Sequence, residues 1–312
     1  MRHILAFALL AAATGHAQDY PAARRDVRHI IPWGAGGATD TAMRGFMQYF
    51  EKHLGTSVVT ENIPGGLSAV GLLRLKMARP DGYTIGTLTY DVLTLSAQGL
   101  APIAWEDFEL IGMVTEHPSA LIVRAERFAT LEAFREEAAA GARIKVGNVG
   151  TGGIWHQHGA AMEKALAISL THIPYEAGSG AQLTALLGGE VDATVASLPA
   201  SLPYVREGTL RVLAVMSEER DALVPDVPTF REKGFDITHG GFRVLAVPRR
   251  TPEDVRHRLE AALRAAWNDR TFQAWAKKAV IGARFRDANE TRVYLRDTAA
   301  KVNALMKALE LS

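Results

Sequence analysis

The chain has 312 residues, with 35 Lys and Arg against 34 Asp and Glu, and it contains no cysteine. The missing cysteines exclude disulfides, Cys-ligated zinc and thiol catalysis. No basic block alternates with aromatic residues, so nothing indicates a nucleic-acid surface. The length is sufficient for two domains.

The N-terminal residues 1–17 have the pattern of a secretory signal peptide. Arg2 and His3 form a weakly basic start, and an apolar run follows from Ile4 to Ala13. Gly15-His16-Ala17 then places small residues at the two positions that a signal peptidase reads. We therefore expect cleavage after Ala17. The apolar run is too short to span a bilayer, so no stable membrane insertion is expected.

Strand and helix patterns alternate along the rest of the chain. The first predicted helix places Met43, Phe46, Met47 and Phe50 on one face. Alternating strands and helices predict an α/β fold with parallel sheets and right-handed crossovers. No Gly/Ser linker interrupts the chain, so any domain boundary is expected in strands that cross between two lobes. We predict strands over 27–31, 58–60, 84–88, 120–123, 145–149, 169–173, 191–196, 210–215 and 242–247, and helices over 40–54, from the 64–66 turn to about 77, 130–140, 154–166, 179–187, 252–268, 271–279 and 290–309.

Two glycine-rich loops have the same layout. Residues 32–40 read PWGAGGATD and follow the apolar run 27–31, whereas residues 147–156 read GNVGTGGIWH and follow Ile144-Lys145-Val146. Each loop leads into a helical pattern. A strand, a glycine turn and a helix N-terminus form an anion site, because free backbone N–H groups converge there and the helix dipole favours negative charge. We expect the two loops to face each other and hold a carboxylate-bearing ligand.

These motifs resemble the substrate-binding proteins of tripartite tricarboxylate transporters, also called the Bug family. The resemblance runs from about Val27 to the C-terminus. Besides the two loops, it is carried by the segments TENIPGG (60–66), PDGYT (80–84), IPYEAG (173–178), ALLGGEVD (185–192) and PDVPTF (225–230). It implies a two-lobed periplasmic binding protein, a Venus flytrap with parallel-rich sheets flanked by helices. Such a protein closes on a small ligand, usually a carboxylate, without catalysis, and no cofactor or metal is expected.

The resemblance also implies a domain organisation and partners. Lobe one would comprise residues 24–121 plus 248–312, and lobe two residues 122–247. The expected partners are a small carboxylate and the membrane subunits of a transporter, or alternatively a sensor ectodomain, with the chain as a monomer. The sequence departs from the family at three positions. Trp33 and Ala35 stand where the family usually has Phe and Pro, and Gly153 stands where it often has Ser or Thr.

The candidate ligand-binding residues lie in the two loops and at the ends of strands. Asp40 either caps its helix or contacts the ligand; because carboxylates repel, such a contact would run through water, a ligand hydroxyl or an ammonium group. His156 is either a structural histidine or a ligand contact, and its spacing from His158 does not suit a metal site. The candidates are Trp33, Gly34, Ala35, Gly36, Gly37, Thr39, Asp40, Thr89, Gly150, Thr151, Gly152, Gly153, His156, Tyr175 and Ser197.

Trp33 and Trp155 are expected to flank the cleft, where their rings could stack on an aromatic or other unsaturated acid. The simpler alternative is that both rings only support their loops. Neither reading identifies the ligand, because the loops indicate carboxylate capture only as a class.

Two enzyme classes compete with the binding function. Glu61 ends the second strand at the place of a ribose-binding acid in a Rossmann fold, but the first loop lacks the third glycine of that fingerprint. A serine hydrolase is disfavoured because no G-x-S-x-G occurs. A sensor accessory would have the same fold as a transport protein and would differ only in its partner.

Overall fold

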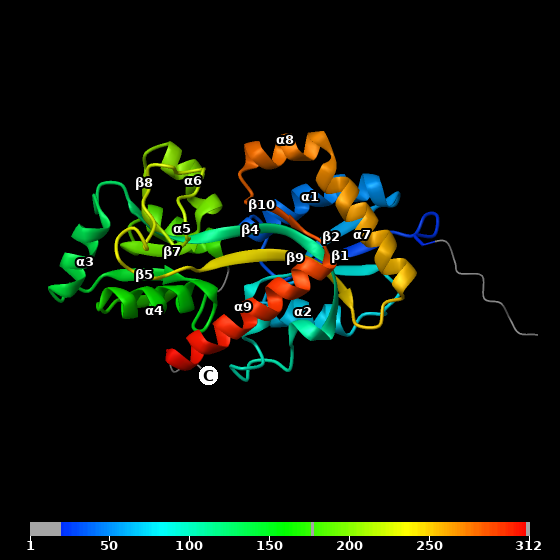
Figure 1. Cartoon of the computed structure of the whole chain (residues 1–312), viewed down its shortest axis with the longest axis horizontal. Helices are drawn as coiled ribbons and strands as arrows, with labels where there is room; N and C mark the ends of the chain where they lie inside the picture. The colour runs from blue at the N-terminus through cyan, green and yellow to red at the C-terminus, as the bar shows by residue number, and fades with distance from the viewer. Residues whose placement is uncertain (1–19, 176–177, 310–312) are drawn as a thin grey trace, which may run out of the picture.

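The computed structural model describes residues 20–175 and 178–309, so the expected signal peptide lies outside the described residues. The described chain forms two units joined by two long strands, β4 and β9 (Figure 1). The first unit contains β1 (Val27–Ile31), α1 (Ala38–Leu54), β2 (Val58–Asn62), α2 (Ala69–Lys76), β3 (Thr84–Leu88) and the 3-10 helices η1 (Tyr90–Leu93) and η2 (Trp105–Asp107). β4 (Phe108–Arg124) then crosses to the second unit.

The second unit and the returning segment complete the fold. The second unit contains α3 (Leu131–Ala139), β5 (Lys145–Asn148), α4 (Ile154–Leu166), β6 (Thr171–Pro174), α5 (Ser179–Leu187), β7 (Ala193–Ser197), α6 (Leu198–Arg206) and β8 (Leu210–Val215). The chain returns through β9 (Gly240–Pro248) and ends with α7 (Glu253–Asn268), α8 (Arg270–Ala279), β10 (Ala283–Arg286) and α9 (Ala288–Ala308).

The strands form one curved sheet in the order β2-β1-β3-β9-β4-β7-β5-β6. β1 pairs in parallel with β2 and β3, and β5 pairs in parallel with β6 and β7. The middle is antiparallel, because β4 pairs with β9 in the first unit and with β7 and β8 in the second. The sheet therefore has parallel pairing within each unit, as the strand–helix alternation predicted, and antiparallel pairing through β4 and β9 in the middle.

Three apolar clusters stabilise the two units. In the first unit, Phe46 and Phe50 of α1 pack with Leu259 of α7 and Phe272 of α8, so the C-terminal helices cover the N-terminal one. In the second unit, Leu186 of α5 and Leu202 of α6 pack against residues of β4, β7 and β8. The third cluster runs from α2 through the middle of the sheet to α4. These contacts hold the strands and helices that flank the two glycine loops, β1 with α1 and β5 with α4.

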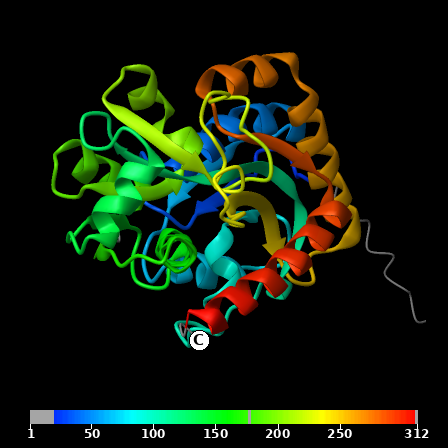
Figure 2. The ribbon, with the colours of Figure 1, turned by 60° about the vertical axis from the view of Figure 1, so that its left-hand side comes forward.

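Helix α9 spans both units. It lies against β4, and its C-terminal end comes close to α4 (Figures 1 and 2). Lys164 Nζ on α4 donates a hydrogen bond of 3.2 Å to the carbonyl of Ala308. In the part of the chain that the structure describes, no helix is long and apolar enough to cross a membrane.

Most helices and strands predicted from the sequence are present in the structure, and the two main differences concern β4 and α6. The prediction of strand 120–123 covers only the end of β4, because Glu109, Glu116 and Pro118 interrupt the apolar pattern before it. Helix α6 was not predicted, since it begins at Leu198-Pro199 and contains Pro203, which ordinarily breaks a helix. The lobe boundaries at 121/122 and 247/248 stay a prediction.

Gly45 on α1 lies where α1 and α8 pack closely. A Cβ at this position would overlap the Trp275 ring. We expect Gly45→Ala to lower the free energy of unfolding by about 1–3 kcal/mol, although Ala favours helix over Gly. The measurement is urea unfolding followed by circular dichroism. The control is Gly180→Ala at an exposed position of α5, where a Cβ meets open space and stability should be unchanged or higher. Equal stability of the two variants would contradict this packing.

Candidate ligand-binding site

The β1–α1 loop and the β5–α4 loop adopt the same backbone shape. Gly36 and Gly152 have φ angles of 76° and 79°, a left-handed conformation that favours glycine. The next residues, Gly37 and Gly153, precede their helices with φ/ψ of −76°/170° and −74°/168°. The repeated glycine pattern in the sequence thus corresponds to one loop geometry used twice, once in each unit.

Each helix secures its own loop with one side chain. Asp40 Oδ2 accepts the N–H of Gly36 at 3.0 Å, and His156 Nδ1 accepts the N–H of Gly152 at 3.0 Å. In both cases the acceptor is the fourth residue after the glycine. Asp40 and His156 are therefore equivalent in the two units, and both stabilise the glycine turn.

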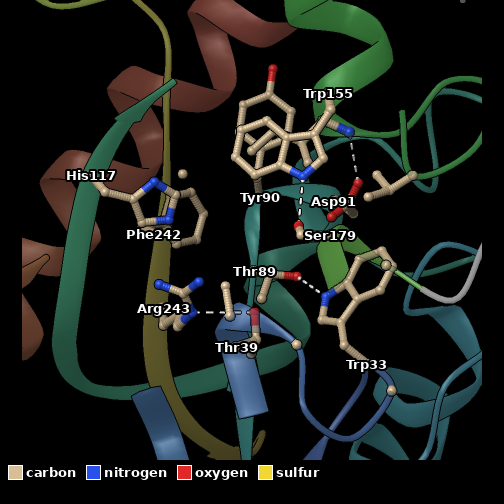
Figure 3. A pocket seen from close by; sticks show the side chains of 17 residues that line it. Trp33, Thr39, Thr89, Tyr90, Asp91, His117, Trp155, Ser179, Phe242 and Arg243 are labelled. Carbon is tan, nitrogen blue, oxygen red and sulfur yellow. Dashed lines mark hydrogen bonds between the residues drawn. The ribbon is translucent and has the colours of Figure 1, made fainter. Parts of the chain in front are cut away.

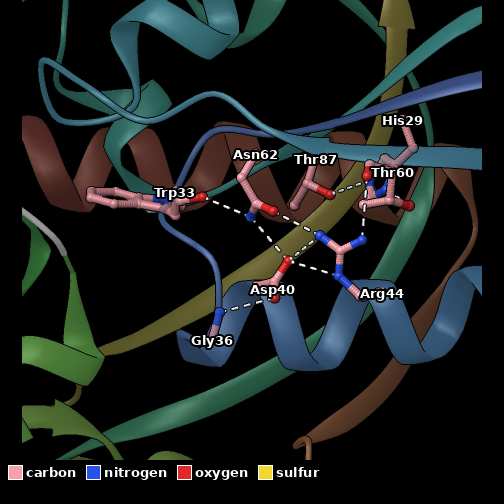
Figure 4. A network of polar contacts seen from close by, with 8 residues as sticks. All are labelled: His29, Trp33, Gly36, Asp40, Arg44, Thr60, Asn62 and Thr87. Carbon is pink, nitrogen blue, oxygen red and sulfur yellow. Dashed lines mark hydrogen bonds and ion pairs between the residues drawn. The ribbon is translucent and has the colours of Figure 1, made fainter.

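Asp40 lies at the centre of a polar network behind the first loop (Figure 4). Its Oδ1 accepts hydrogen bonds from Arg44 at 2.8 Å and from Asn62 at 2.9 Å, and Asn62 also donates to the Trp33 carbonyl. Burial raises the pKa of Asp40, but the hydrogen bonds from Arg44, Gly36 and Asn62 outweigh it and hold the pKa below its usual range. Asp40 is thus ionised, and both of its carboxylate oxygens accept hydrogen bonds from groups of the protein.

A pocket opens between the two loops (Figure 3). Its empty space measures about 510 Å³, including the part that is open to solvent. Both units contribute to its wall, so closure of the units would enclose a ligand. The described residues that line it are Trp33, Gly34, Gly37, Ala38, Thr39, Thr89, Tyr90, Asp91, His117, Val149, Ile154, Trp155, Gly178, Ser179, Gly241, Phe242 and Arg243.

Two tryptophans face the pocket from opposite units, and each is oriented by a hydroxyl. Trp33 Nε1 donates to Thr89 Oγ1 at 3.0 Å, and Trp155 Nε1 donates to Ser179 Oγ at 3.0 Å. Because these bonds fix the indole rings, the aromatic faces form a preorganised apolar wall.

Arg243 places a buried positive charge in the pocket. It is only 4% exposed, and its guanidinium donates to Thr39 Oγ1 at 3.2 Å and Thr115 Oγ1 at 3.0 Å. Burial lowers the pKa of Arg243 to about 10, so the group stays protonated at neutral pH. Both protein partners are neutral hydroxyls, and no carboxylate among the described residues forms an ion pair with it.

His117 lies beside this charge and does not balance it. Burial, together with the positive charge of Arg243, holds the pKa of His117 well below its usual range. The imidazole is therefore neutral, and the positive potential of Arg243 remains available to a bound anion.

Asp91 brings a buried acid to the same pocket. The side chain lies in η1 of the first unit, is 1% exposed, and accepts the N–H of Ile154 at 3.1 Å through Oδ1. Ile154 is the first residue of α4, so this hydrogen bond connects the two units. Burial raises the pKa of Asp91 to about 7, although the hydrogen bond from Ile154 opposes the shift.

The structure brings together five of the residues predicted from the sequence. Trp33, Gly34, Gly37, Thr39 and Thr89 line the pocket, and so does Trp155, which the sequence paired with Trp33. Ala35 and Gly36 are exposed beside the pocket, and Asp40 lies behind the loop.

On the second loop the predicted residues lie off the pocket wall. Gly150 and Gly153 shape the turn through a 3.0 Å backbone hydrogen bond, Thr151 is exposed, and the Gly152 carbonyl accepts from Gln98 and Gln157. His156 stabilises the loop, as described above. Tyr175 donates to Glu190 at 3.4 Å and Ser197 is buried at the end of β7, and neither residue lines the pocket.

The two charged residues of the pocket, Arg243 and Asp91, were not among the residues predicted from the sequence. Arg243 is the single charge in the apolar run from Phe242 to Val247, and Asp91 is the single charge between Thr89 and Leu95. A lone charge inside an apolar segment is the signal that could have identified both. Phe242 and His117 carry no such signal, because their positions depend on the pairing of β4 with β9.

Comparisons with known proteins agree on one family. The model of the family described as tripartite tricarboxylate transporter family receptor matches residues 43–311. A protein of Agrobacterium vitis, encoded in the TAR-I ttuE-ttuC' intergenic region, is 32% identical over 261 residues, which cover 81% of this chain and 74% of that protein.

Two solved structures support the same assignment. A TctC solute-binding protein from Polaromonas is 32% identical, with a TM-score of 0.72, and the match covers 93% of this chain and 99% of that chain. MatC from Rhodopseudomonas palustris, solved with bound malate, is 26% identical, with a TM-score of 0.83 and coverage of 91% and 99%. The resemblance drawn from the loops is confirmed, as is the two-lobed α/β fold.

The raised pKa of Asp91 makes stability depend on pH. The unfolded chain ionises this group near 3.8 and the folded chain only near 7, so stability decreases as the pH rises through that window. We expect Asp91→Asn, which keeps the acceptor for Ile154, to gain stability relative to wild type between pH 5 and pH 8, by on the order of 3 kcal/mol. Urea unfolding at both pH values measures this difference. If the difference in unfolding free energy between Asp91→Asn and wild type is the same at pH 5 and pH 8, the pKa of Asp91 is not raised in the folded protein.

Proposed function

This chain belongs to the tripartite tricarboxylate transporter receptor family, and we propose that it captures its carboxylate ligand on Arg243 in the pocket between the two units. It is a solute-binding protein of the kind that serves transport. The relative MatC was solved with malate, a small carboxylate, which supports the same ligand class for this pocket.

The observation that carries the proposal is the buried guanidinium without a carboxylate partner. A buried charge is unfavourable unless it is paired and hydrogen-bonded. Arg243 uses one N–H on Thr39 and one on Thr115, so further donors of its planar fork remain for a ligand. A carboxylate matches that fork with two parallel hydrogen bonds, which are among the stronger ones in proteins.

The N-terminus of α1 supports the same role. Gly37, Ala38 and Thr39 all line the pocket, so the start of this 17-residue helix faces the space beside Arg243. Free N–H groups and the helix dipole favour an anion here. Thr39 belongs to both features, because its hydroxyl accepts from Arg243.

The competing functions have less support. Glu61, the candidate ribose-binding acid, does not line the pocket and lies 3.3 Å from Arg28 instead. The family is one of receptors and not of enzymes. We therefore propose that this chain binds its ligand without converting it. We also propose that it acts as a monomer and delivers the ligand to transporter subunits in the membrane, in preference to a sensor.

The receptors of this family are periplasmic binding proteins. For this chain we propose export by the N-terminal signal pattern and cleavage after Ala17. The lobe boundaries at 121/122 and 247/248 are proposed on the same resemblance, and the passage of β4 from pairing with β9 to pairing with β7 at Pro118–Ser119 lies near the first of them.

Replacement of Arg243 tests the proposal. Carboxylates such as malate, succinate and benzoate are titrated into the protein by isothermal calorimetry, and each is recovered unchanged. Arg243→Gln keeps a side chain that can reach Thr39 but removes the charge, so we expect the Kd to rise at least about 100-fold, or about 2.8 kcal/mol.

The matched control is Arg211→Gln, because Arg211 donates to the Phe128 carbonyl away from the pocket. This control should bind like wild type. Unchanged affinity in Arg243→Gln, or turnover of a bound carboxylate by pure protein, would overturn the proposal.

The two pocket tryptophans give an optical readout of closure. Ligand that bridges the units should exclude water from the rings of Trp33 and Trp155 and shift their fluorescence. We expect this shift to shrink in Trp33→Phe and in Trp155→Phe, and to persist in Trp267→Phe, which alters a ring packed against Phe272. A full shift in both pocket variants would show that these rings do not respond to the ligand.

A further inference from the structure

The pocket holds a buried cation, Arg243, and a buried carboxyl group, Asp91, which gains its negative charge as the pH rises through about 7. Asp91 and Arg243 both line it, and their exposed fractions are 1% and 4%. In Figure 3, Arg243 extends from β9 on one side of the pocket, and Asp91 lies on the other side near Trp155. They form no ion pair with each other, and neither forms one with any other residue within 20–175 and 178–309.

This arrangement is costly for an empty protein. Each ion removed from water without a partner carries a desolvation penalty of several kcal/mol. Proteins ordinarily pair such groups, and the pocket separates them instead. A ligand with one negative and one positive group would give both side chains a partner at once.

The second glycine loop points to the same ligand chemistry. The first N–H of α4, which could attract a second ligand carboxylate, is already bound to Asp91 Oδ1 at 3.1 Å. A dicarboxylate spanning the pocket would therefore meet a carboxyl group where the sequence predicted an anion site. No side chain among the described residues donates to Asp91, so its second oxygen can accept from a ligand.

We propose that Asp91 is a specificity-determining residue that receives an ammonium group of the ligand, while Arg243 receives its carboxylate. The ligand is then an amino acid in the broad chemical sense, with a carboxylate and an amine on one small skeleton. This inference rests on the proposed function, because it takes the carboxylate on Arg243 as given. The remaining wall, including Trp33, Trp155 and Phe242, contacts the apolar part of the skeleton.

Asp91 is the group in this pocket that changes charge near neutral pH. Burial raises its pKa to about 7. Burial also raises the pKa of neighbouring Tyr90 and holds those of His117 and His158 well below their usual range. Arg243, with a pKa of about 10, stays charged. An ammonium ligand should thus bind more tightly as the pH rises from 6 to 8, whereas a carboxylate without an amine should bind more weakly.

The test compares ligands that differ only by an amine. The three pairs are aspartate and succinate, phenylalanine and 3-phenylpropanoate, and 4-aminobutanoate and butanoate, each titrated by calorimetry at pH 6 and pH 8. At pH 8 we expect at least one amino acid to bind at least tenfold more tightly than its amine-free partner. Its affinity should increase by up to about tenfold from pH 6 to pH 8, as Asp91 ionises.

Asp91→Asn assigns the preference to one residue. This variant keeps the acceptor for Ile154 and should lose both the amine preference and the pH dependence, while amine-free carboxylates still bind. The control is Asp297→Asn on the exposed surface of α9, which should behave like wild type. Thermal melts confirm that both variants are folded.

The outcomes separate this inference from the proposed function. If amine-free carboxylates bind as well as their amino partners and depend on Arg243, the inference fails and the proposed function stands. If the amine preference survives in Asp91→Asn, the inference also fails. If no compound of either set binds, the proposed function fails together with the inference.

Discussion

The charge of Arg243 is the constraint on which the site depends. A guanidinium on the central strand β9 is held by two neutral hydroxyls, Thr39 and Thr115, in a wall that excludes water. The hydroxyls orient the guanidinium group but do not neutralise its positive charge. Thr39 also stands in the first turn of α1, so the first glycine loop, the helix dipole and the buried charge all favour an anion at one end of the pocket. An anionic ligand is what completes this arrangement.

The two glycine loops show how one local geometry can serve different purposes. Their glycines have nearly identical dihedral angles, and Asp40 and His156 secure them in equivalent ways. The first loop exposes the start of its helix to the pocket. The start of α4 also lines the pocket, but its first N–H is already bound to Asp91 from the other unit. The two loops thus differ both in the groups that face them and in the side chains that they carry, Thr39 at the start of α1 and Trp155 at the start of α4.

Local patterns predicted most of the elements, and long-range contacts account for what was missed. The helix 154–166 and the strands 27–31 and 84–88 were predicted within a residue, because apolar periodicity and glycine stops are local signals. Trp33, Thr39 and Thr89 were predicted as site residues because they belong to a recognisable loop or strand end. Arg243 and Asp91 belong to no such motif, and a lone charge in an apolar segment does not say which pocket the residue enters. Arg243 reaches the pocket through the antiparallel pairing of β9 with β3 and β4, which brings residues far apart in the sequence together, whereas Asp91 lies in η1 just after Thr89 and is directed to the pocket by its contact with α4 of the other unit. The loop motif also could not reveal that Asp40 faces away from the pocket, since Arg44 and Asn62 determine its orientation.

The most direct test is a crystal structure of the protein with a bound carboxylate, taken from the titrations or retained through native purification. We expect both carboxylate oxygens within hydrogen-bond distance of the Arg243 guanidinium, beside the N-terminus of α1. A carboxylate held elsewhere in the protein, with Arg243 still bound only to Thr39 and Thr115, would show that Arg243 does not capture the ligand.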